Sequence, residues 1–276
     1  MNKYAYLLRE IFECNTITQR ELAQKMSLSL GSVNTLIKEA LSLNYITKSD
    51  NKAVLTSSGL DYLSAFKVDR AIIMAAGFGS RFVPLTFETP KGLLEVFGER
   101  MIERQIKQLH EVGVFDIVIV VGYLKEHFEY LIDKYNVKLV YNPDYSTKNN
   151  ISTLHYAAEY IKGFNVYILS SDNWMRENMY HRYEPYSWYS SIYMEGNTNE
   201  WVLKFNKKRE ITDIKVGGKD AYVMYGPVYF CKDFSNVFIP ILEKAFFTPG
   251  SDDWYWENVL MNEIKAENKD LPAIHI

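Results

Sequence analysis

The chain has few cysteines, no long apolar run and no signal-peptide pattern. Its two cysteines, Cys14 and Cys231, are too few and too far apart in sequence for a disulfide framework or a Cys-x-x-Cys metal site. The most apolar run, residues 117–121, is far shorter than the about 20 residues of a membrane-spanning helix. Arg9 and Glu10 interrupt the N-terminal apolar residues. We therefore expect a soluble, cytoplasmic protein with no membrane partner.

A strongly basic surface is also absent. The 276 residues include 31 Lys and Arg against 34 Asp and Glu, a net charge of −3, so any nucleic-acid contact must be local. The length predicts one large or two modest domains with ample chain for a core. Aromatic residues are abundant, with 21 Tyr, 15 Phe and 5 Trp.

The first 68 residues show a helical pattern. Apolar residues recur at helical spacing from Tyr6 to Phe12, which predicts a first helix ending near residue 15. Thr18 and Glu21 fit a capping box, because each side chain can accept a backbone N–H at the start of a second, short helix. Ser29 is the predicted N-cap of a third helix.

A strand–turn–strand pattern follows these helices. Residues 45–47 and 53–55 flank a polar turn, and a last helix is predicted to end near residue 66. This order of elements resembles the winged helix-turn-helix domain of bacterial regulators. The resemblance implies that residues 29–43 are the recognition helix. The residues that it would direct into the major groove of DNA are Ser32, Asn34, Thr35 and Lys38.

The charge of this unit leaves its role open. Residues 1–68 contain 8 Lys and Arg against 6 Asp and Glu, a net charge of +2, which is weak for a protein that must neutralise several phosphates. One interpretation is a DNA-binding domain. The other is a dimerisation or docking module that keeps the fold without the DNA activity. The oligomeric state is not predicted by the sequence.

Strand and helix patterns alternate from Asp69 onward. The predicted strands cover residues 71–74, 117–121, 138–141 and 165–169, with helices at 101–111, 126–134 and 152–161. This alternation predicts an α/β fold with a Rossmann-like, mainly parallel sheet and helices on both faces. Beyond Trp188 strands dominate, at 190–194, 201–205, 211–216 and 222–230. We therefore predict two domains, a winged-helix domain at 1–68 and an α/β domain at 69–276.

A glycine loop follows the first strand of the second domain. The string runs Ala75-Ala76-Gly77-Phe78-Gly79-Ser80-Arg81. Glycine lets backbone amides approach a phosphate closely, and successive amides can form an anion-binding concavity. A Gly-x-Gly-x-x-Gly dinucleotide motif is excluded by Phe82, and the P-loop motif occurs nowhere in the chain. A tight strand-to-helix turn is the alternative interpretation.

The longer string, which continues through Pro84-Leu85-Thr86 to Thr89-Pro90-Lys91, is more specific. It resembles the signature of nucleotidyltransferases that activate sugar-1-phosphates or phosphocholine with a nucleoside triphosphate. The resemblance covers residues 69 to 276 and implies a loop that wraps the triphosphate. The residues implied in holding the phosphates are Ala75, Ala76, Gly77, Gly79, Ser80, Arg81 and Lys91.

A carboxylate follows the strand at residues 165–169. Ligands of α/β proteins lie at the carboxyl ends of the strands, and Mg²⁺ is often bound by one or two carboxylates with substrate phosphates. By the resemblance, Asp172 is the metal-binding aspartate and Glu257 the second ligand, so Mg²⁺ is the expected cofactor. Ser170 stands where related sequences often carry an earlier acid. An Asp-Asn turn is the alternative interpretation.

Aromatic residues beside acids characterise two later segments, Glu195 to Trp201 and Asp253 to Glu257. A quaternary ammonium cannot donate an N–H hydrogen bond, so proteins hold it with aromatic faces and carboxylates. Both segments resemble bacterial CTP:phosphocholine cytidylyltransferases, whose choline pocket is such a cage. The residues implied in acceptor binding are Glu195, Trp201, Tyr229, Asp253, Tyr255 and Trp256. Core packing is the alternative for these aromatic side chains.

Residues 142–152 resemble a segment of the same enzymes. Asparagine side chains both donate and accept, which suits the edge of cytosine. The residues assigned to the nucleotide on this basis are Asn142, Tyr145, Asn150 and Ser152. Turn formation is the alternative.

The predicted activity is Mg²⁺-dependent transfer of CMP from CTP to phosphocholine, giving CDP-choline and pyrophosphate. The catalytic residues would be Lys91, Arg81 and Asp172. No general base is needed, because the attacking phosphate is already an anion. Two alternatives stay open: a sugar-1-phosphate nucleotidyltransferase, and a transcription regulator that senses CTP or CDP-choline. The chain ends before the closing strand and helix expected of the family, which leaves open a longer natural protein.

Overall fold

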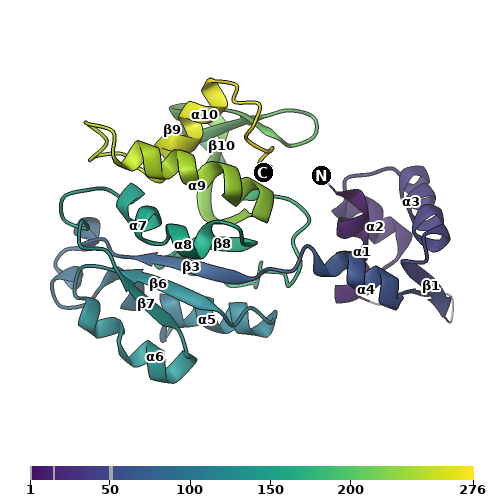
Figure 1. Cartoon of the computed structure of the whole chain (residues 1–276), viewed down its shortest axis with the longest axis horizontal. Coiled ribbons are helices and arrows are strands. Elements are labelled where there is room, and N and C mark those ends of the chain that lie inside the picture. The colour runs from purple at the N-terminus through teal and green to yellow at the C-terminus, as the bar shows by residue number, and fades with distance from the viewer. Residues whose placement is uncertain (1, 15, 50–51) are drawn as a thin grey trace. The chain divides into compact units, whose positions relative to one another are not determined.

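The computed structural model describes residues 2–14, 16–49 and 52–276 and divides the chain into two compact units (Figure 1). The first unit comprises Met1–Val68 with His181–Tyr186, and the second comprises Asp69–Tyr180 with Ser187–Ile276. The predicted second domain is therefore interrupted, because its chain contributes residues 181–186 to the first unit. Among the described residues, no helix is long and apolar enough to cross a membrane.

The first unit has the predicted order of helices and hairpin. Its elements are α1 (Lys3–Glu13), α2 (Gln19–Lys25), α3 (Leu30–Ser42), β1 (Ile46–Ser49), β2 (Lys52–Leu55) and α4 (Ser57–Ser64). The capping box at α2 is confirmed: Thr18 Oγ1 accepts from the Glu21 amide at 3.2 Å, and Glu21 Oε2 accepts from the Thr18 amide at 2.7 Å. Ser29 caps α3 as predicted. Residues 50 and 51 of the predicted turn lie outside the described residues.

The inner faces of these helices form one apolar core. Its buried members include Leu7, Leu8, Ile11, Leu22, Met26, Val33, Leu36, Ile37, Ala40, Ile46 and Leu63. Tyr183, from the contributed segment, belongs to the same core and meets the Phe12 ring edge to face at 5.1 Å. The outer face of α3 stays exposed and carries all four residues predicted to face DNA: Ser32, Asn34, Thr35 and Lys38.

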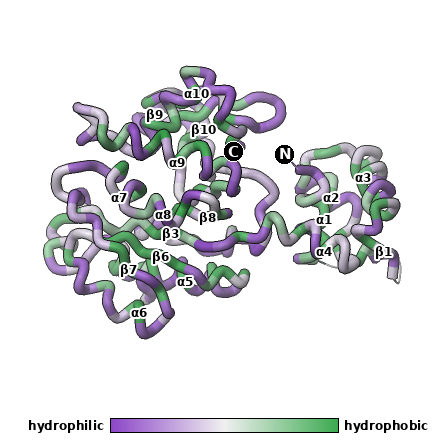
Figure 2. Tube along the Cα trace, viewed as in Figure 1, coloured by the Kyte–Doolittle hydropathy of each residue, from purple (hydrophilic) through white to green (hydrophobic). Residues whose placement is uncertain are grey.

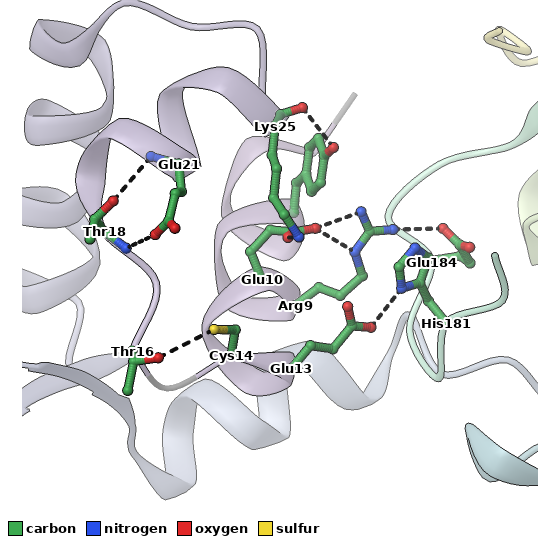
Figure 3. Close-up of polar contacts among 11 residues, drawn as sticks. Arg9, Glu10, Glu13, Cys14, Thr16, Thr18, Glu21, Lys25, His181 and Glu184 are labelled. Atoms are coloured by element: carbon green, nitrogen blue, oxygen red, sulfur yellow. Dashed lines mark hydrogen bonds and ion pairs between the residues drawn. The ribbon is translucent and has the colours of Figure 1, made fainter. Parts of the chain in front are cut away.

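A buried ion-pair network ties the contributed segment to α1 (Figure 3). Arg9 Nη1 lies 2.9 Å from Glu184 Oε2, and Arg9 Nη2 lies 2.8 Å from Glu10 Oε1. Lys25 Nζ completes the network at 2.6 Å from Glu10 Oε2. Burial alone would lower the pKa of Arg9, but the Glu184 and Glu10 carboxylates raise it overall. Two positive and two negative charges thus balance, with Arg9, Glu10 and Glu184 buried and the Lys25 side chain half-exposed.

The second unit is built on a six-stranded sheet in the order β7-β6-β3-β8-β10-β9. The strands are β3 (Arg70–Ala75), β6 (Ile117–Val121), β7 (Lys138–Tyr141), β8 (Val166–Ser170), β9 (Trp188–Phe205) and β10 (Ile211–Phe230). β7, β6, β3 and β8 are parallel, whereas β10 is antiparallel to both β8 and β9. The predicted α/β fold with a mainly parallel sheet is confirmed. The four strands predicted beyond residue 188 are instead two long ones.

Helices cover both faces of the sheet (Figure 1). One side carries α5 (Met101–Glu111), η4 (Lys125–Phe128) and α6 (Tyr130–Tyr135), and the other carries α7 (Ile151–Tyr156), α8 (Ala158–Ile161) and α9 (Lys232–Phe246). A last helix, α10 (Trp256–Lys265), packs on β10 and α9. The sequence analysis did not predict α9 and α10. The central strands are strongly hydrophobic (Figure 2), because both their faces are buried.

We predict that Glu184→Gln lowers the free energy of opening of α1 far more than Glu13→Gln does. Glu184 is buried, so its loss leaves the network with one uncompensated positive charge and costs about 3 kcal/mol. Glu13 pairs with His181 at a partly exposed position, where a pair contributes about 0.5 kcal/mol. Hydrogen–deuterium exchange of the α1 amides in the full chain measures both opening free energies. Equal effects of the two variants would contradict the buried network.

Candidate functional site

The sheet has a topological switch point between β3 and β8. From β3 the chain proceeds to β6 and then β7 on one side, whereas β8 pairs with β3 on the other side. The carboxyl ends of β3 and β8 are neighbours, with Met74 opposite Ser170. Ligands of doubly wound sheets bind in the crevice that such a reversal creates. A cavity of about 790 Å³ lies there.

The glycine loop forms one wall of this cavity. It leaves β3 and continues through the short helical turns η1 (Ser80–Phe82), η2 (Leu85–Phe87) and η3 (Lys91–Leu93). Gly79 has a φ of 64°, and a Cβ there would lie 3.0 Å from Thr86 Cγ2 and 3.1 Å from Lys91 Cβ. Only glycine combines that conformation with such close packing. All seven residues predicted to hold phosphates line the cavity: Ala75, Ala76, Gly77, Gly79, Ser80, Arg81 and Lys91.

Lys91 and Asp172 join the two loops at the switch point. The Lys91 ammonium forms an ion pair with Asp172 Oδ2, and both side chains line the cavity. Gly92 allows this approach, because a Cβ there would lie 2.6 Å from Ser171 Cβ. The predicted lysine and the predicted metal-binding aspartate are therefore brought together, although 81 positions separate them in the chain.

Glu257 is a second carboxylate on the same cavity, at the start of α10. Burial raises its pKa to about 7, against the hydrogen bonds from its own backbone, Asn150 and Tyr189. A nearby divalent cation would favour the charged form of such a carboxyl group.

The oxygen donors of Asp172 and Glu257 fit a hard cation such as Mg²⁺, which commonly takes one or two carboxylates and completes its shell with phosphates and water. Across residues 2–14, 16–49 and 52–276, no group of three or more His, Cys, Asp or Glu forms a metal cluster.

Aromatic and acidic side chains from β9 and from the segment before α10 line another part of the cavity. Trp201 on β9 meets Tyr255 edge to face, with ring centroids 6.1 Å apart. Tyr225, Glu200 and Asp253 line the same cavity. Three of the predicted acceptor residues, Trp201, Asp253 and Tyr255, are thus brought together.

The other three predicted acceptor residues lie outside the cavity lining. Trp256 and Tyr229 are each 0% exposed and belong to the core, which corrects their assignment as cage walls. Trp256 stacks on Tyr189 at 5.8 Å and meets Phe230 edge to face. Glu195 is exposed in the middle of β9, and the acid that reaches the cavity from this segment is Glu200.

Several polar side chains of the segment at 142–152 form hydrogen bonds within the segment itself. Asn142 is fully buried, and its side chain donates to Ser152 Oγ at 2.9 Å and accepts from the Asp144 amide at 2.9 Å. Ser152 is buried as well and lies outside the cavity lining, so its predicted base contact is corrected to local scaffolding. Asn142 does line the cavity, and its base contact stays a prediction. Tyr145 and Asn150 do line the cavity.

Several cavity residues escaped the sequence analysis. Tyr189, Glu200 and Tyr225 lie on the long β9–β10 hairpin, where local composition does not show which side chains face the cavity. Glu200 had one available signal, its position directly before Trp201. Tyr189 and Tyr225 had no signal of their own.

Comparison with known protein families assigns both units. The family model described as "Nucleotidyl transferase" matches residues 70–187. The model described as "Winged helix-turn-helix DNA-binding" matches residues 7–47. The winged-helix match lies within the first unit, whereas the nucleotidyl transferase match covers part of the second unit together with residues 181–186 of the first.

Individual relatives narrow the assignment. The chain is 38% identical over 196 residues to a choline-phosphate cytidylyltransferase of Streptococcus pneumoniae, covering 71% of this chain and 85% of that protein. It is 37% identical over 198 residues to a 2-aminoethylphosphonate cytidylyltransferase of Lancefieldella rimae, covering 70% and 80%. The solved structure of the CTP:phosphocholine cytidylyltransferase of Streptococcus pneumoniae matches with a TM-score of 0.70 and 36% identity, covering 76% of this chain and 88% of that one. The chain therefore belongs to the nucleotidyl transferase family as a cytidylyltransferase that also carries a winged helix-turn-helix domain.

Proposed function

We propose that this cytidylyltransferase transfers CMP from CTP to phosphocholine, using Mg²⁺, and releases CDP-choline and pyrophosphate. One observation carries the choice of acceptor: the Trp201 and Tyr255 rings meet beside Asp253 on the cavity that also holds the glycine loop and Asp172. An aromatic corner beside carboxylates suits a permanently charged ammonium group.

The donor end of the cavity supplies positive charge and backbone amides. The amides of the glycine loop and the Arg81 side chain would hold the triphosphate of CTP. Lys91 would exchange its partner Asp172 for the reacting phosphates, leaving the carboxylate to a cation. The ion pair therefore keeps both groups in place and neutral overall before the substrates bind.

The reaction is a displacement at phosphorus. A phosphate oxygen of phosphocholine attacks the α-phosphorus of CTP, a new P–O bond forms, and the bond to the oxygen bridging to the β-phosphate breaks. Pyrophosphate leaves with that electron pair, so the step needs no oxidant and no proton acceptor. Bound Mg²⁺ would neutralise phosphate charge and favour the in-line geometry. Asp172 and Glu257 would hold it, and the chain's remaining task is alignment of the two substrates.

The acceptor end distinguishes a quaternary from a primary ammonium group. A primary ammonium has three N–H donors and is best held by several acceptor oxygens, as 2-aminoethylphosphonate would require. A trimethylammonium group offers methyl groups with spread positive charge, which pack against ring faces. The Trp201 and Tyr255 rings favour the latter, whereas the carboxylates of Glu200 and Asp253 attract either cation.

We infer a second role for the winged-helix unit, namely binding of double-stranded DNA. The match to a DNA-binding winged helix-turn-helix model and the exposed outer face of α3 support it. Arg9 is buried and Lys25 is paired with Glu10, so we expect the phosphate contacts from other cations such as Lys38. Because those cations are few, the affinity should depend only weakly on salt.

An acceptor panel tests the proposed reaction. With CTP and Mg²⁺, pyrophosphate release is expected to show the highest kcat/KM for phosphocholine, compared with phosphoethanolamine, 2-aminoethylphosphonate and glucose-1-phosphate. The reason is that the Trp201 and Tyr255 rings bind a methylated cation more tightly than an unmethylated one. A higher kcat/KM for 2-aminoethylphosphonate or for glucose-1-phosphate would overturn the choice of acceptor.

Trp201→Ala should raise the KM for phosphocholine about tenfold, equivalent to a cation–π contribution of roughly 1.4 kcal/mol, and leave the KM for CTP nearly unchanged. The matched control is Tyr193→Ala, which removes an exposed ring from the same strand outside the cavity lining. Initial-rate kinetics with each substrate varied in turn separates the two constants. An unchanged phosphocholine KM in Trp201→Ala would remove the ring pair from the account.

DNA binding is tested by selecting from a pool of random-sequence duplexes with the full chain and titrating the selected DNA by fluorescence anisotropy. Lys38→Ala should lower the slope of log affinity against log salt by about 1, because one phosphate contact is lost. Glu13→Gln serves as a control, since Glu13 lies on α1 and pairs with His181. Failure to select any duplex, or a slope unaffected by Lys38→Ala, would favour a docking module instead.

A further inference from the structure

The carboxylate of Glu257 is held by two neutral side chains from distant parts of the chain. Tyr189 on β9 donates its hydroxyl to Glu257 Oε1 at 3.1 Å. Asn150, at the start of α7, donates its side-chain amide to Glu257 Oε2 at 3.4 Å. All three residues line the cavity. With the hydrogen bond from its own backbone, the carboxylate has three protein donors on two oxygens and keeps lone-pair capacity for another partner.

Neither of these two side-chain donors carries a positive charge that would neutralise the Glu257 carboxylate. Within the described residues, no Lys, Arg or His forms an ion pair with this carboxylate, in contrast to Asp172, which pairs with Lys91. Hydrogen bonds from a hydroxyl and an amide orient a carboxylate without cancelling its charge. Such neutral outer partners are typical of carboxylates that ligate metal ions.

Asn150 also determines where the helix carrying Glu257 begins. Its Oδ1 accepts the backbone N–H of Trp256 at 2.8 Å, at the first position of α10. The preceding residue, Asn149, reinforces this junction, since its amide donates to the Asp252 carbonyl at 2.7 Å. One asparagine thus orients both the start of the helix and the carboxylate that follows.

Tyr189 is itself locked by packing. Its ring stacks on the buried Trp256 at a centroid distance of 5.8 Å and an interplanar angle of 19°. Trp256, which the sequence predicted as a cage wall, is instead a core side chain that fixes the position of the Tyr189 hydroxyl by stacking on its ring. A small change at either ring would therefore move the donor relative to the carboxylate.

We propose that Tyr189 and Asn150 are positioning residues that hold the Glu257 carboxylate toward the divalent cation of the bound nucleotide. This inference rests on the proposed Mg²⁺-dependent function, and it replaces the predicted base contact of Asn150. Neither residue is assigned a bond to substrate. Their effect passes through the position of Glu257.

Tyr189→Phe tests the proposal, because it removes the hydroxyl and keeps the stacked ring. Binding of Mn²⁺ with CTP, without acceptor and hence without turnover, is followed by water-proton relaxation, which reports Mn²⁺ immobilised on the protein. We expect about tenfold weaker Mn²⁺ binding in the variant. The matched control is Tyr180→Phe, since the Tyr180 hydroxyl is buried without a hydrogen-bond partner among the described residues. Equal Mn²⁺ affinity in Tyr189→Phe and the wild type would overturn the proposal.

A double-variant cycle separates positioning from a general structural effect. If Tyr189 acts through Glu257, Tyr189→Phe combined with Glu257→Gln should bind Mn²⁺ no more weakly than Glu257→Gln alone. Additive losses would contradict the proposal, as would equal losses in Tyr189→Phe and Tyr180→Phe.

Failure of the proposed function gives a different result. If the wild type binds Mn²⁺ with CTP but releases no pyrophosphate with phosphocholine, the acceptor assignment fails while the positioning comparison still stands. If the wild type releases pyrophosphate but Tyr189→Phe keeps full Mn²⁺ affinity, the function stands and the positioning role fails.

Discussion

The ion pair between Lys91 and Asp172 joins the two loops on which the site depends. Each loop leaves the carboxyl end of a parallel strand, and the two strands are neighbours because the chain reverses its winding direction between β3 and β8. The pair can form only because Gly92 lets the loops touch. A triphosphate with its cation brings a negative partner for Lys91 and a positive partner for Asp172. The site is therefore arranged for that ligand before it binds.

The cavity segment that carries Tyr255 and Glu257 is joined to the start of α7 by backbone and side-chain hydrogen bonds. Asn149 and Asn150 contact the segment from Asp252 to Glu257, which carries the Tyr255 ring and the second carboxylate. In the proposed transfer, alignment of the attacking phosphate with the α-phosphorus would depend on this junction between residues more than a hundred positions apart in sequence. In a reaction without a general base, this alignment and the neutralisation of charge are the main contributions that the protein can make.

Local signals in the sequence predicted what local physics determines. The Thr18 capping box, the Ser29 cap, the buried parallel strands and the glycine loop all appear in the structure.

The sequence did not show which side chains face the cavity and which face the core. Tyr255 and Trp256 are adjacent, yet one lines the cavity and the other is core, because α10 begins between them. The buried residues Trp256, Val259 and Leu260 follow helical spacing, a signal that the aromatic run obscured. The sequence analysis also missed α9, which contains Pro240 and in which Phe234, Phe238 and Leu242 repeat every four residues. Glu200 could not be preferred over Glu195 from sequence, because a register shift in β9 between Thr198 and Trp201 determines which acid reaches the cavity.

The central claim is that Asp172 binds a divalent cation together with the nucleotide. Isothermal titration of CTP into the wild type and Asp172→Asn, with and without Mg²⁺ and without acceptor, tests it most directly. The account predicts that Mg²⁺ strengthens CTP binding to the wild type and that Asp172→Asn loses this strengthening. Without Mg²⁺ the variant should bind CTP at least as tightly as the wild type, because Lys91 no longer has a competing carboxylate. An equal gain from Mg²⁺ in both proteins would contradict the account.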